Sequence, residues 1–247
     1  MIDSIAKENE IGSLPAGDVC AVIVAAGRGL RMKASAPKQF LPMAGKPVLA
    51  HTVSVFAGCP EIDRIVVVVA KEDVSFCRDR VLPGAGGSKP LFLAEGGVHR
   101  ADSVFSGIEA AGAGTGIVVI HDGVRPLVHR DQIGKVIAGA RENGACILAC
   151  PVFDTLKRVS GNGQVMQTVD RTGLWTAQTP QAFRYELIRK AHLSAQKSGT
   201  AVTDDAQLLE RLDLPVRVVS GDGFNLKITT PQDLKMAEAL LAAMNKP

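Results

Sequence analysis

The sequence predicts an α/β fold: a mostly parallel, Rossmann-like sheet with helices on both faces and a protruding β-hairpin arm. Short, continuous apolar runs rich in Val and Ile, such as residues 64–70 (RIVVVVA), are typical of strands that are buried on both faces. Stretches with helical spacing of apolar residues separate these runs, and this alternation implies parallel strands joined by right-handed crossovers. The chain has 247 residues, of which 46% are hydrophobic and 21% charged, so it can bury a sizeable core.

The chain alternates between strands and helices up to residue 152. The apolar runs predict strands at residues 19–25, 64–70, 91–94, 116–121 and 145–152. Helical spacing predicts helices at residues 47–58, 100–111 and 131–143. Pro47 suits the first position of the first helix, and Gly144 suits the end of the third. A polar helical stretch follows residue 70, and the cluster PGAGG at residues 83–87 ends it.

The alternation lapses at residues 153–179, where the pattern changes to that of a hairpin. Alternating residues 155–159, a turn at 160–163 (SGNG) and residues 164–169 predict a two-stranded arm at about residues 153–172. An isolated hairpin is marginal in water, so we expect the arm to pack on a second subunit.

The C-terminal part returns to helices and short strands. Helices are expected at residues 183–196 and 204–212, the second with Thr203 as its N-cap. Short strands are expected at residues 216–219 and 226–228. Thr230 and Pro231 are expected to open the last helix, as N-cap and first residue.

Composition and charge limit the class of protein. The net charge is only +3 and the basic excess is local, so we expect no binding to nucleic acid. No run of about 18 apolar residues predicts a membrane span. Residues 1–18 are polar and lack a signal-peptide core, so we expect a flexible tail before a single domain at residues 19–247.

Five cysteines, an odd number, lie mostly in apolar runs, which is typical of buried free thiols in a reducing, cytoplasmic compartment. Cys146 and Cys150 have no second Cys or His pair that would complete a zinc site. We therefore expect no zinc site at these cysteines and assign no residue as a dedicated metal ligand.

Residues 19–49 carry the most distinctive chemistry. The first predicted strand leads into a loop of small residues and cations: Ala25, Ala26, Gly27, Arg28, Gly29, Arg31, Lys33 and Lys38. No acid lies between Asp18 and Glu61 to pair with these cations locally. Small residues let backbone N–H groups approach an anion, and the cations neutralise it. The loop therefore indicates a polyphosphate site, although a basic surface loop after a strand is the alternative.

Two common phosphate loops do not fit this segment. A P-loop needs Gly-Lys before Ser or Thr, whereas Gly45-Lys46 precedes Pro47. A dinucleotide-binding loop needs GxGxxG at the start of a helix and an acid about 20 residues further on. The sequence after Gly27 satisfies neither requirement.

Two further motifs lie at expected ligand positions. GGVHRADSV, residues 96–104, precedes a helix and would bring backbone amides and the Ser103 hydroxyl to a ligand, unless it is only a glycine turn. Asp122 ends a strand, where a carboxylate can hold ribose hydroxyls or a phosphate-bound Mg²⁺, or can simply form a turn. Because ligands bind at the carboxyl ends of parallel strands, Asp122 and the first loop should meet. Arg125 suits a second anion, although a surface arginine would look the same.

Lys227 is flanked by the apolar Leu226 and Ile228, so alternation directs it away from the core and toward a cleft. Arg171 follows the second arm strand. Together the two cations could clamp a phosphate, and the alternative is an Arg171–Asp170 surface pair beside a solvated Lys227.

The motifs together resemble a known family. Residues 25–32 (AAGRGLRM) and 37–39 (PKQ) resemble the opening of the nucleotidyltransferases that activate sugar phosphates. The stretch VDRTGLWTAQTPQAF, residues 169–183, extends the resemblance to the 2-C-methyl-D-erythritol 4-phosphate cytidylyltransferase family of the non-mevalonate isoprenoid pathway. The ribitol-phosphate cytidylyltransferases share the first loop and the glycine–serine motif but resemble this middle stretch less.

The resemblance implies roles for particular residues. Arg31 and Lys38 would stabilise the transition state, and Arg171 and Lys227 would position the sugar phosphate. The CTP site would be lined by Ala25, Ala26, Gly27, Gly97, Ser103 and Asp122. The methylerythritol phosphate would be faced by Arg125, Thr155 and Thr203. Gly123-Val124 and Val98 depart from the family pattern, which often has two small residues and an acid at these places.

The resemblance also implies a reaction and partners. A phosphate oxygen of methylerythritol phosphate would attack the α-phosphorus of CTP and release pyrophosphate, with Mg²⁺ bound mainly through the CTP phosphates. The protein would be a homodimer in which each arm reaches the partner's site. The alternatives are transfer to another polyol phosphate, such as ribitol 5-phosphate, and a non-catalytic CTP-binding module.

Overall fold

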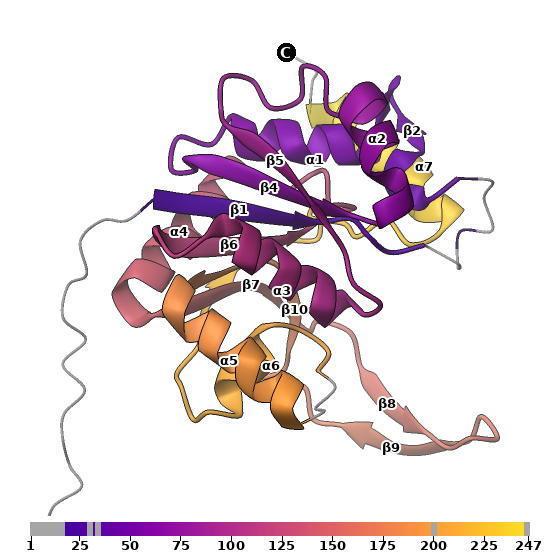
Figure 1. Ribbon diagram of the computed structural model, residues 1–247. Helices are drawn as coiled ribbons and strands as arrows, with labels where there is room; N and C mark the ends of the chain where they lie inside the picture. Colours follow the sequence, from indigo (N-terminus) through magenta and orange to yellow (C-terminus); the bar gives the residue numbers. More distant parts are fainter. Residues whose placement is uncertain (1–17, 29–31, 33–35, 199–201, 245–247) are drawn as a thin grey trace, which may run out of the picture.

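The computed structural model describes residues 18–28, 32, 36–198 and 202–244. These residues form a seven-stranded central sheet with the strand order β11-β7-β10-β6-β1-β4-β5 (Figure 1). The sheet strands are β1 (Asp18–Val24), β4 (Arg64–Val69), β5 (Leu91–Glu95), β6 (Thr115–Asp122), β7 (Ala145–Pro151), β10 (Trp175–Arg184) and β11 (Arg217–Ser220). The expected tail falls almost wholly at residues 1–17, outside the described residues.

The sheet is mostly parallel, as predicted. β1 pairs in parallel with β4 and β6, β4 with β5, and β11 with β7. β10 is the exception, because it lies antiparallel between β6 and β7. The carboxyl ends of β1, β4, β5 and β6 consequently share one edge of the sheet.

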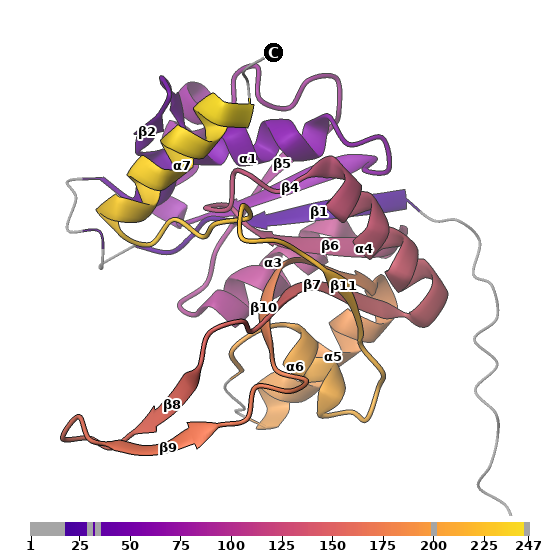
Figure 2. The ribbon, with the colours of Figure 1, turned by 180° about the vertical axis from the view of Figure 1, so that it is seen from behind.

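Helices cover both faces of the sheet (Figures 1 and 2). One layer contains α1 (Val48–Ala57) and α4 (Arg130–Asn143), together with the short turns η3 (Lys71–Asp73), α2 (Val74–Phe76) and η4 (Cys77–Val81). The other contains α3 (Arg100–Ala111), α5 (Tyr185–Ser198) and α6 (Ala206–Glu210). Because side chains alternate along a strand, Ile23 of β1 packs in the first core and Val22 in the second.

A third, smaller core anchors the C-terminal part. α7 (Pro231–Met244) buries Ala237 against Met43 of the short hairpin β2 (Pro42–Met43) and β3 (Lys46–Pro47). Val124 and Ile228 belong to the same cluster, so the segment before α7 is fastened to the end of β6. Within the described residues, no helix combines the length and hydrophobicity that a bilayer span needs.

The arm is present where the sequence predicts it. β8 (Leu156–Val159) and β9 (Val165–Val169) pair only with each other, antiparallel, in a separate two-stranded sheet. Both views show this ribbon projecting away from the rest of the molecule (Figures 1 and 2). The arm leads directly into β10, so the sheet and the arm are continuous in the chain.

The N-terminal elements and the last helix confirm the prediction to within one or two residues. Pro47 is the N-cap of α1 and not its first residue, because it still belongs to β3 and the helix begins at Val48. Thr230 caps α7 as expected: its Oγ1 accepts a hydrogen bond from Asp233 N at 3.3 Å, and Asp233 Oδ2 accepts one from Thr230 N at 2.7 Å.

Four details of the prediction between residues 153 and 230 are wrong. β10 is absent from it, and the helix expected from residue 183 begins at Tyr185 because Phe183 still pairs with Val118 of β6. Thr203 does not cap α6: the flanking residue is Asp205, and Thr203 N donates to Gln207 Oε1. Residues 226–228 form no strand.

Candidate active site

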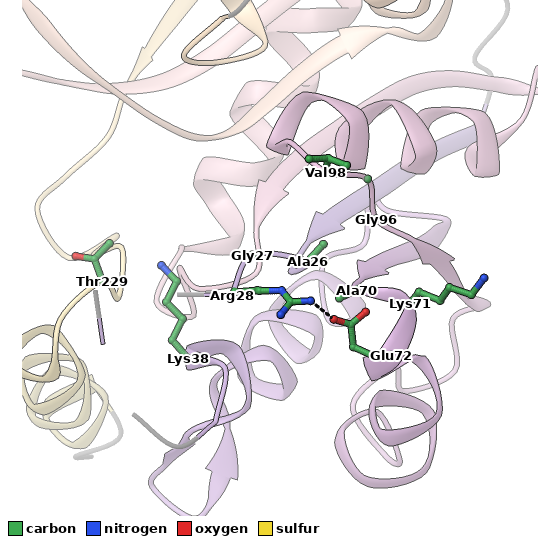
Figure 3. Close-up of a pocket in the computed structure, with 11 residues that line it drawn as sticks. Ala26, Gly27, Arg28, Lys38, Ala70, Lys71, Glu72, Gly96, Val98 and Thr229 are labelled. Carbon is green, nitrogen blue, oxygen red and sulfur yellow. Dashed lines mark hydrogen bonds and ion pairs between the residues drawn. The ribbon is translucent and has the colours of Figure 1, made fainter. Parts of the chain in front are cut away.

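A cavity of about 900 Å³ opens at the shared carboxyl ends of the strands. Its walls are the loops after β1, β4 and β5, together with Lys38 and Thr229. Figure 3 shows Lys38 and Thr229 on one side of it and the loop with Gly96 and Val98 on the other. A cavity of about 180 Å³ adjoins it and reaches Asp122, Lys227 and Ser103.

The loop after β1 is held by buried backbone contacts. Ala25 N donates to Val68 O at 2.7 Å, and Ala25 O accepts a hydrogen bond from the buried Gln39 Nε2 at 2.7 Å. Gln39 belongs to the single turn η2 (Lys38–Phe40), so the same turn fixes the loop and directs Lys38 into the cavity. Sequence reasoning missed this role, because a glutamine next to the PK pair carries no distinctive spacing.

The loop after β5 packs closely against the loop after β1. A Cβ atom on Gly96 would lie 2.3 Å from Ala26 Cβ and 2.9 Å from Ser103 Oγ. Gly97 N donates to Ser103 Oγ at 3.1 Å, and Ser103 as a residue is 2% exposed. Ser103 therefore shapes the Gly97 loop as well as lining the cavity.

Asp122 is the charged centre of the smaller cavity. Its Oδ1 lies 3.2 Å from Arg100 Nε, while its Oδ2 lies 2.6 Å from Lys227 Nζ and 3.8 Å from Arg125 Nε. Burial favours the neutral carboxyl, but the charge of Arg100, followed by those of Lys227 and Arg125, outweighs it and lowers the pKa of Asp122 far below its ordinary value. Thr179 Oγ1 accepts a hydrogen bond from Asp122 N at 3.0 Å and fixes the backbone there.

The segment before α7 brings Lys227 to this centre. Ile228 N donates to Val124 O at 2.9 Å, and Ile228 O accepts from Lys38 Nζ at 3.0 Å. This single backbone contact replaces the strand expected at residues 226–228. Ile228 is buried while Lys227 faces the cavity, so the predicted alternation of the two side chains is confirmed.

Asn225 attaches the same segment to β10. Its Nδ2 donates to Gln178 Oε1 at 3.0 Å and to Thr179 O at 2.8 Å, and its backbone carbonyl accepts from Arg125 Nη1 at 2.6 Å. Asn225 is 1% exposed. It thus ties Arg125 to β10, whose Thr179 accepts the hydrogen bond from Asp122 N.

The structure assembles eight of the expected site residues in the wall of the smaller cavity: Ala25, Ala26, Gly27, Lys38, Gly97, Ser103, Asp122 and Lys227. The residues that depart from the family pattern, Val98 and Gly123, fit the site without a clash. Val98 is 91% exposed on the rim, and Gly123 lies against Ala25, where a Cβ atom would come within 3.0 Å of Ala25 Cβ.

Arg125 lines neither cavity, although its Nε lies 3.8 Å from Asp122 Oδ2. The other four expected residues lie elsewhere or outside the described residues. Arg171 is exposed at the base of the arm and donates to Phe153 O, not to Asp170. Thr155 and Thr203 are exposed and line neither of these two cavities. Arg31 falls in residues 29–31, which the structure does not describe.

Arg100 and Arg28 are among the charged residues in the cavity walls that sequence reasoning did not assign. Arg100 lines the smaller cavity and pairs with both Asp122 and the buried Asp205. Arg28 lines the larger cavity and pairs with Glu72 at 2.6 Å, as the dashed line in Figure 3 marks. The basic composition of the first loop indicates Arg28. Arg100 could not be identified in this way, because its partner Asp205 is 105 positions away in the sequence.

The carboxylates of the site suit a metal ion that is held mainly by the phosphates of a bound substrate and only partly by the protein. No group of three or more His, Cys, Asp or Glu side chains with metal-binding geometry occurs among the described residues. Asp122 is the one carboxylate in the described wall of the smaller cavity. Mg²⁺ commonly binds through one or two carboxylates together with substrate phosphates, so Asp122 beside a polyphosphate fits this ion.

Comparison with known proteins identifies the family. The family model described as 2-C-methyl-D-erythritol 4-phosphate cytidylyltransferase matches residues 19–243. The proteins of that name from Desulforamulus reducens and Geobacter metallireducens are 45% and 46% identical to this chain, over 93% and 90% of it and 98% and 97% of their own lengths.

Solved structures agree with this assignment. The 4-diphosphocytidyl-2C-methyl-D-erythritol synthase from Anaerococcus prevotii has a TM-score of 0.80 and 34% identity, over 92% of this chain and 96% of its own. The 2-C-methyl-D-erythritol 4-phosphate cytidylyltransferase from Thermus thermophilus has a TM-score of 0.75 and 33% identity, over 91% and 99%. The resemblance predicted from the motifs is confirmed, and the chain belongs to the 2-C-methyl-D-erythritol 4-phosphate cytidylyltransferase family of nucleotidyltransferases.

Proposed function

We propose that this chain transfers CMP from CTP to 2-C-methyl-D-erythritol 4-phosphate and releases pyrophosphate. The observation that carries the proposal is the convergence of Lys38, Lys227 and Asp122 with the small-residue loop in one cavity. Family membership supports the choice of both substrates and gives no support to ribitol 5-phosphate or to a module that only binds CTP.

Charge neutralisation and alignment supply most of the catalysis in this proposal. Both reactants are polyanions, so their approach needs cations that are already in place. The role proposed for Lys38 and Arg31 is to stabilise the charge that develops at the α-phosphorus and on the leaving pyrophosphate. The acceptor phosphate is an anion at neutral pH, so the attack needs no general base.

The nucleoside is held by the two glycine-containing loops. Ala26 and Gly27 present backbone amides to the triphosphate, Ala25 fixes their loop to β4 through its own amide, and Gly97 with Ser103 receives the cytosine edge. Asp122 holds ribose hydroxyls or a phosphate-bound Mg²⁺. When bound, Mg²⁺ withdraws charge from the phosphates and assists the departure of pyrophosphate.

The acceptor is placed by cations and hydroxyls from two subunits. Lys227 lies in the cavity, while Arg125 is fixed beside it by Asn225. Arg171 and Thr155 complete this half-site when the arm of a partner subunit approaches, and Thr203 adds a hydroxyl from outside the arm. A guanidinium and an ammonium acting from two sides hold the acceptor oxygen in line with the α-phosphorus.

We propose a homodimer formed through the arm, at about residues 153–172. The arm exposes Phe153, Val159, Val165 and Met166, each at least half exposed. A two-stranded ribbon is too small to be stable alone, and this apolar surface supports its packing on a second copy of the chain.

We further propose that the reaction takes place in the cytoplasm. All five cysteines are free, and four are buried. Burial raises the pKa of Cys77 to about 12, so this thiol is protonated and inert at neutral pH. Free thiols of this kind suit a reducing compartment.

One assay tests the central proposal. Pyrophosphate release is measured with CTP, Mg²⁺ and a panel of acceptors that includes methylerythritol phosphate and ribitol 5-phosphate, with each component omitted in turn. We expect release only when CTP, Mg²⁺ and methylerythritol phosphate are all present. Equal or greater release with ribitol 5-phosphate would overturn the choice of acceptor, and CTP binding without any release would support a binding module instead.

A further inference from the structure

A chain of alternating charges leads from the cavity into the helical layer. It runs from Lys227 to Asp122 on β6, to Arg100 on α3, and then to Asp205 at the start of α6, with His192 of α5 at its far end. The polar groups beyond Arg100 are almost completely buried: Asp205 is 1% and His192 2% exposed. The proposed reaction assigns no task to either of these two residues.

Arg100 is held by two carboxylates through different nitrogens. Its Nε lies 3.2 Å from Asp122 Oδ1, and its Nη1 lies 2.8 Å from Asp205 Oδ2. A planar guanidinium bound along two directions has little freedom to rotate. Asp205 therefore determines how Arg100 meets Asp122.

Asp205 performs no ordinary structural task at its helix. It precedes α6, but its side chain makes no capping hydrogen bond. The neighbouring Asp204 makes the local contacts instead: its Oδ1 accepts from Gln207 N at 3.1 Å and its Oδ2 from Gln181 Nε2 at 2.9 Å. The two adjacent aspartates thus have different roles, and Asp205 is directed inward to Arg100.

The second oxygen of Asp205 faces α5 and accepts no hydrogen bond from the described residues. Asp205 Oδ1 lies 3.4 Å from His192 Nε2, and the His192 ring stacks on Phe105 of α3 with 5.9 Å between ring centroids. Burying a carboxylate is costly, and a buried ion pair by itself is weak support for a stabilising role. The arrangement instead keeps one charge in one orientation.

We propose that Asp205 is a positioning residue for the CTP site, acting on Asp122 through Arg100. With Asp205 in place, Arg100 divides its charge between two carboxylates, which leaves Asp122 Oδ2 to Lys227. Without that charge, Arg100 turns fully toward Asp122, competes with Lys227 and occupies the carboxylate that CTP or its Mg²⁺ needs. This inference rests on the proposed function for the identity of the nucleotide.

A double-mutant cycle tests the proposal. The CTP dissociation constant is measured by calorimetry, and kcat/KM for CTP by pyrophosphate release, for the wild type, Asp205→Asn, Arg100→Ala and the double variant. We expect Asp205→Asn to raise the CTP dissociation constant about tenfold and to lower kcat/KM about tenfold, which is the effect of losing one charge-assisted hydrogen bond. In the Arg100→Ala background, Asp205→Asn should change neither quantity by more than about twofold.

A matched control separates positioning from simple helix packing. Arg189 of α5 and Glu109 of α3 form an exposed ion pair, with 2.6 Å between Arg189 Nε and Glu109 Oε1. The pair joins two helices of the same layer and lines neither cavity. Glu109→Gln should leave CTP binding and turnover unchanged. An equal loss in Glu109→Gln and Asp205→Asn would show that only helix packing matters and would overturn the proposal.

Two other results would also overturn it: CTP binding in Asp205→Asn that equals the wild type, or losses that multiply in the double variant. If Asp205→Asn does not fold, Arg100→Lys replaces it, because an ammonium cannot span both carboxylates, and wild-type CTP binding by Arg100→Lys would refute the idea. Failure of the wild type to release pyrophosphate would refute the proposed function, while the calorimetric cycle would still decide this inference.

Discussion

Lys38 lines both cavities, and its Nζ donates to Ile228 O at 3.0 Å. We expect Lys38→Ala to lower kcat at least 100-fold and to weaken CTP binding less than tenfold, because one such donor contributes about 3 kcal/mol mainly in the transition state. Arg31→Ala should behave alike. Steady-state kinetics and calorimetry measure the two effects.

Lys46 provides the control for this experiment, since it is exposed on β3. Lys46→Ala should retain wild-type turnover. Near-normal kcat in both Lys38→Ala and Arg31→Ala would show that the first loop does not take part in catalysis.

His121 gives the fold a pH dependence. It is fully buried at the end of β6, packs against Phe56 with the two rings tilted, and has its pKa lowered by burial to about 4. In the unfolded chain its pKa is about 6.5. Above pH 6.5 both states are neutral, whereas at lower pH the unfolded state binds the proton first, so stability falls until about pH 4.

We therefore expect the free energy of unfolding to decrease by on the order of 3 kcal/mol between pH 7 and pH 4, with His121 as a main contributor. Urea denaturation at a series of pH values measures the slope. His121→Gln should have a flatter dependence over this range. A variant with the same slope as the wild type would assign the effect to other groups.

At the residue scale, the sequence was informative where position on a strand decides function. Ala25 and Asp122 follow or end parallel strands, so the topology alone brings them together. Gln39, Arg100 and Asp205 could not be found this way. Their partners are distant in the sequence, and a lone Gln, Arg or Asp looks the same in a surface helix as in a buried network.

The loops after β1 and β5 meet at Gly96 with no space for a side chain. Gly96→Ala should push the Ala26 loop away, because the new Cβ would lie 2.3 Å from Ala26 Cβ. We expect at least a tenfold weaker CTP dissociation constant, measured by calorimetry. Gly114→Ala is the control, since nothing lies within 4 Å of a Cβ there. Equal CTP binding by all three proteins would show that the contact between the loops is unimportant.

At the element scale, the prediction failed where polar residues are buried. β10 has the sequence WTAQTPQAFR, which lacks both apolar alternation and a continuous apolar run. Thr179 and Gln181 are nevertheless buried, because hydrogen bonds to Asp122 N and Asp204 satisfy them. Partners from other segments thus make a polar sequence suitable for the middle of a sheet. Residues 226–228 show the opposite case. Their alternating apolar pattern is typical of a strand, but they make one backbone hydrogen bond to another segment, from Ile228 N to Val124 O, and pair with no strand.

Assembly belongs to the whole molecule, and the arm is its expected contact. Met166 of β9 is 64% exposed. We expect Met166→Asp to convert a dimer of two 26.0 kDa chains into monomers in sedimentation, because it places a charge in an apolar interface. Gln167→Asp, on the opposite face of the same strand, should dissociate the dimer less. A wild-type protein that sediments as an active monomer would contradict the arrangement.

A site shared between subunits can also be tested by complementation. Arg171 lies at the base of the arm and Lys227 in the cavity of the same chain, so the two serve different sites if the arm crosses to the partner. Arg171→Ala and Lys227→Ala should each be inactive alone. Mixed dimers should recover activity, because each has one intact site. No recovery after proven subunit exchange would indicate that each site is complete within one chain.

β10 leaves the arm at Trp175 and reaches Thr179, the partner of Asp122 N, four residues later. Any force on the arm is thus transmitted along a short, hydrogen-bonded strand to the nucleotide pocket. If dimerisation through the arm strengthens CTP binding, CTP must strengthen the contact between subunits by the same factor, because the two equilibria are thermodynamically linked. The Michaelis constant would then depend on enzyme concentration, and CTP itself would act as an assembly signal.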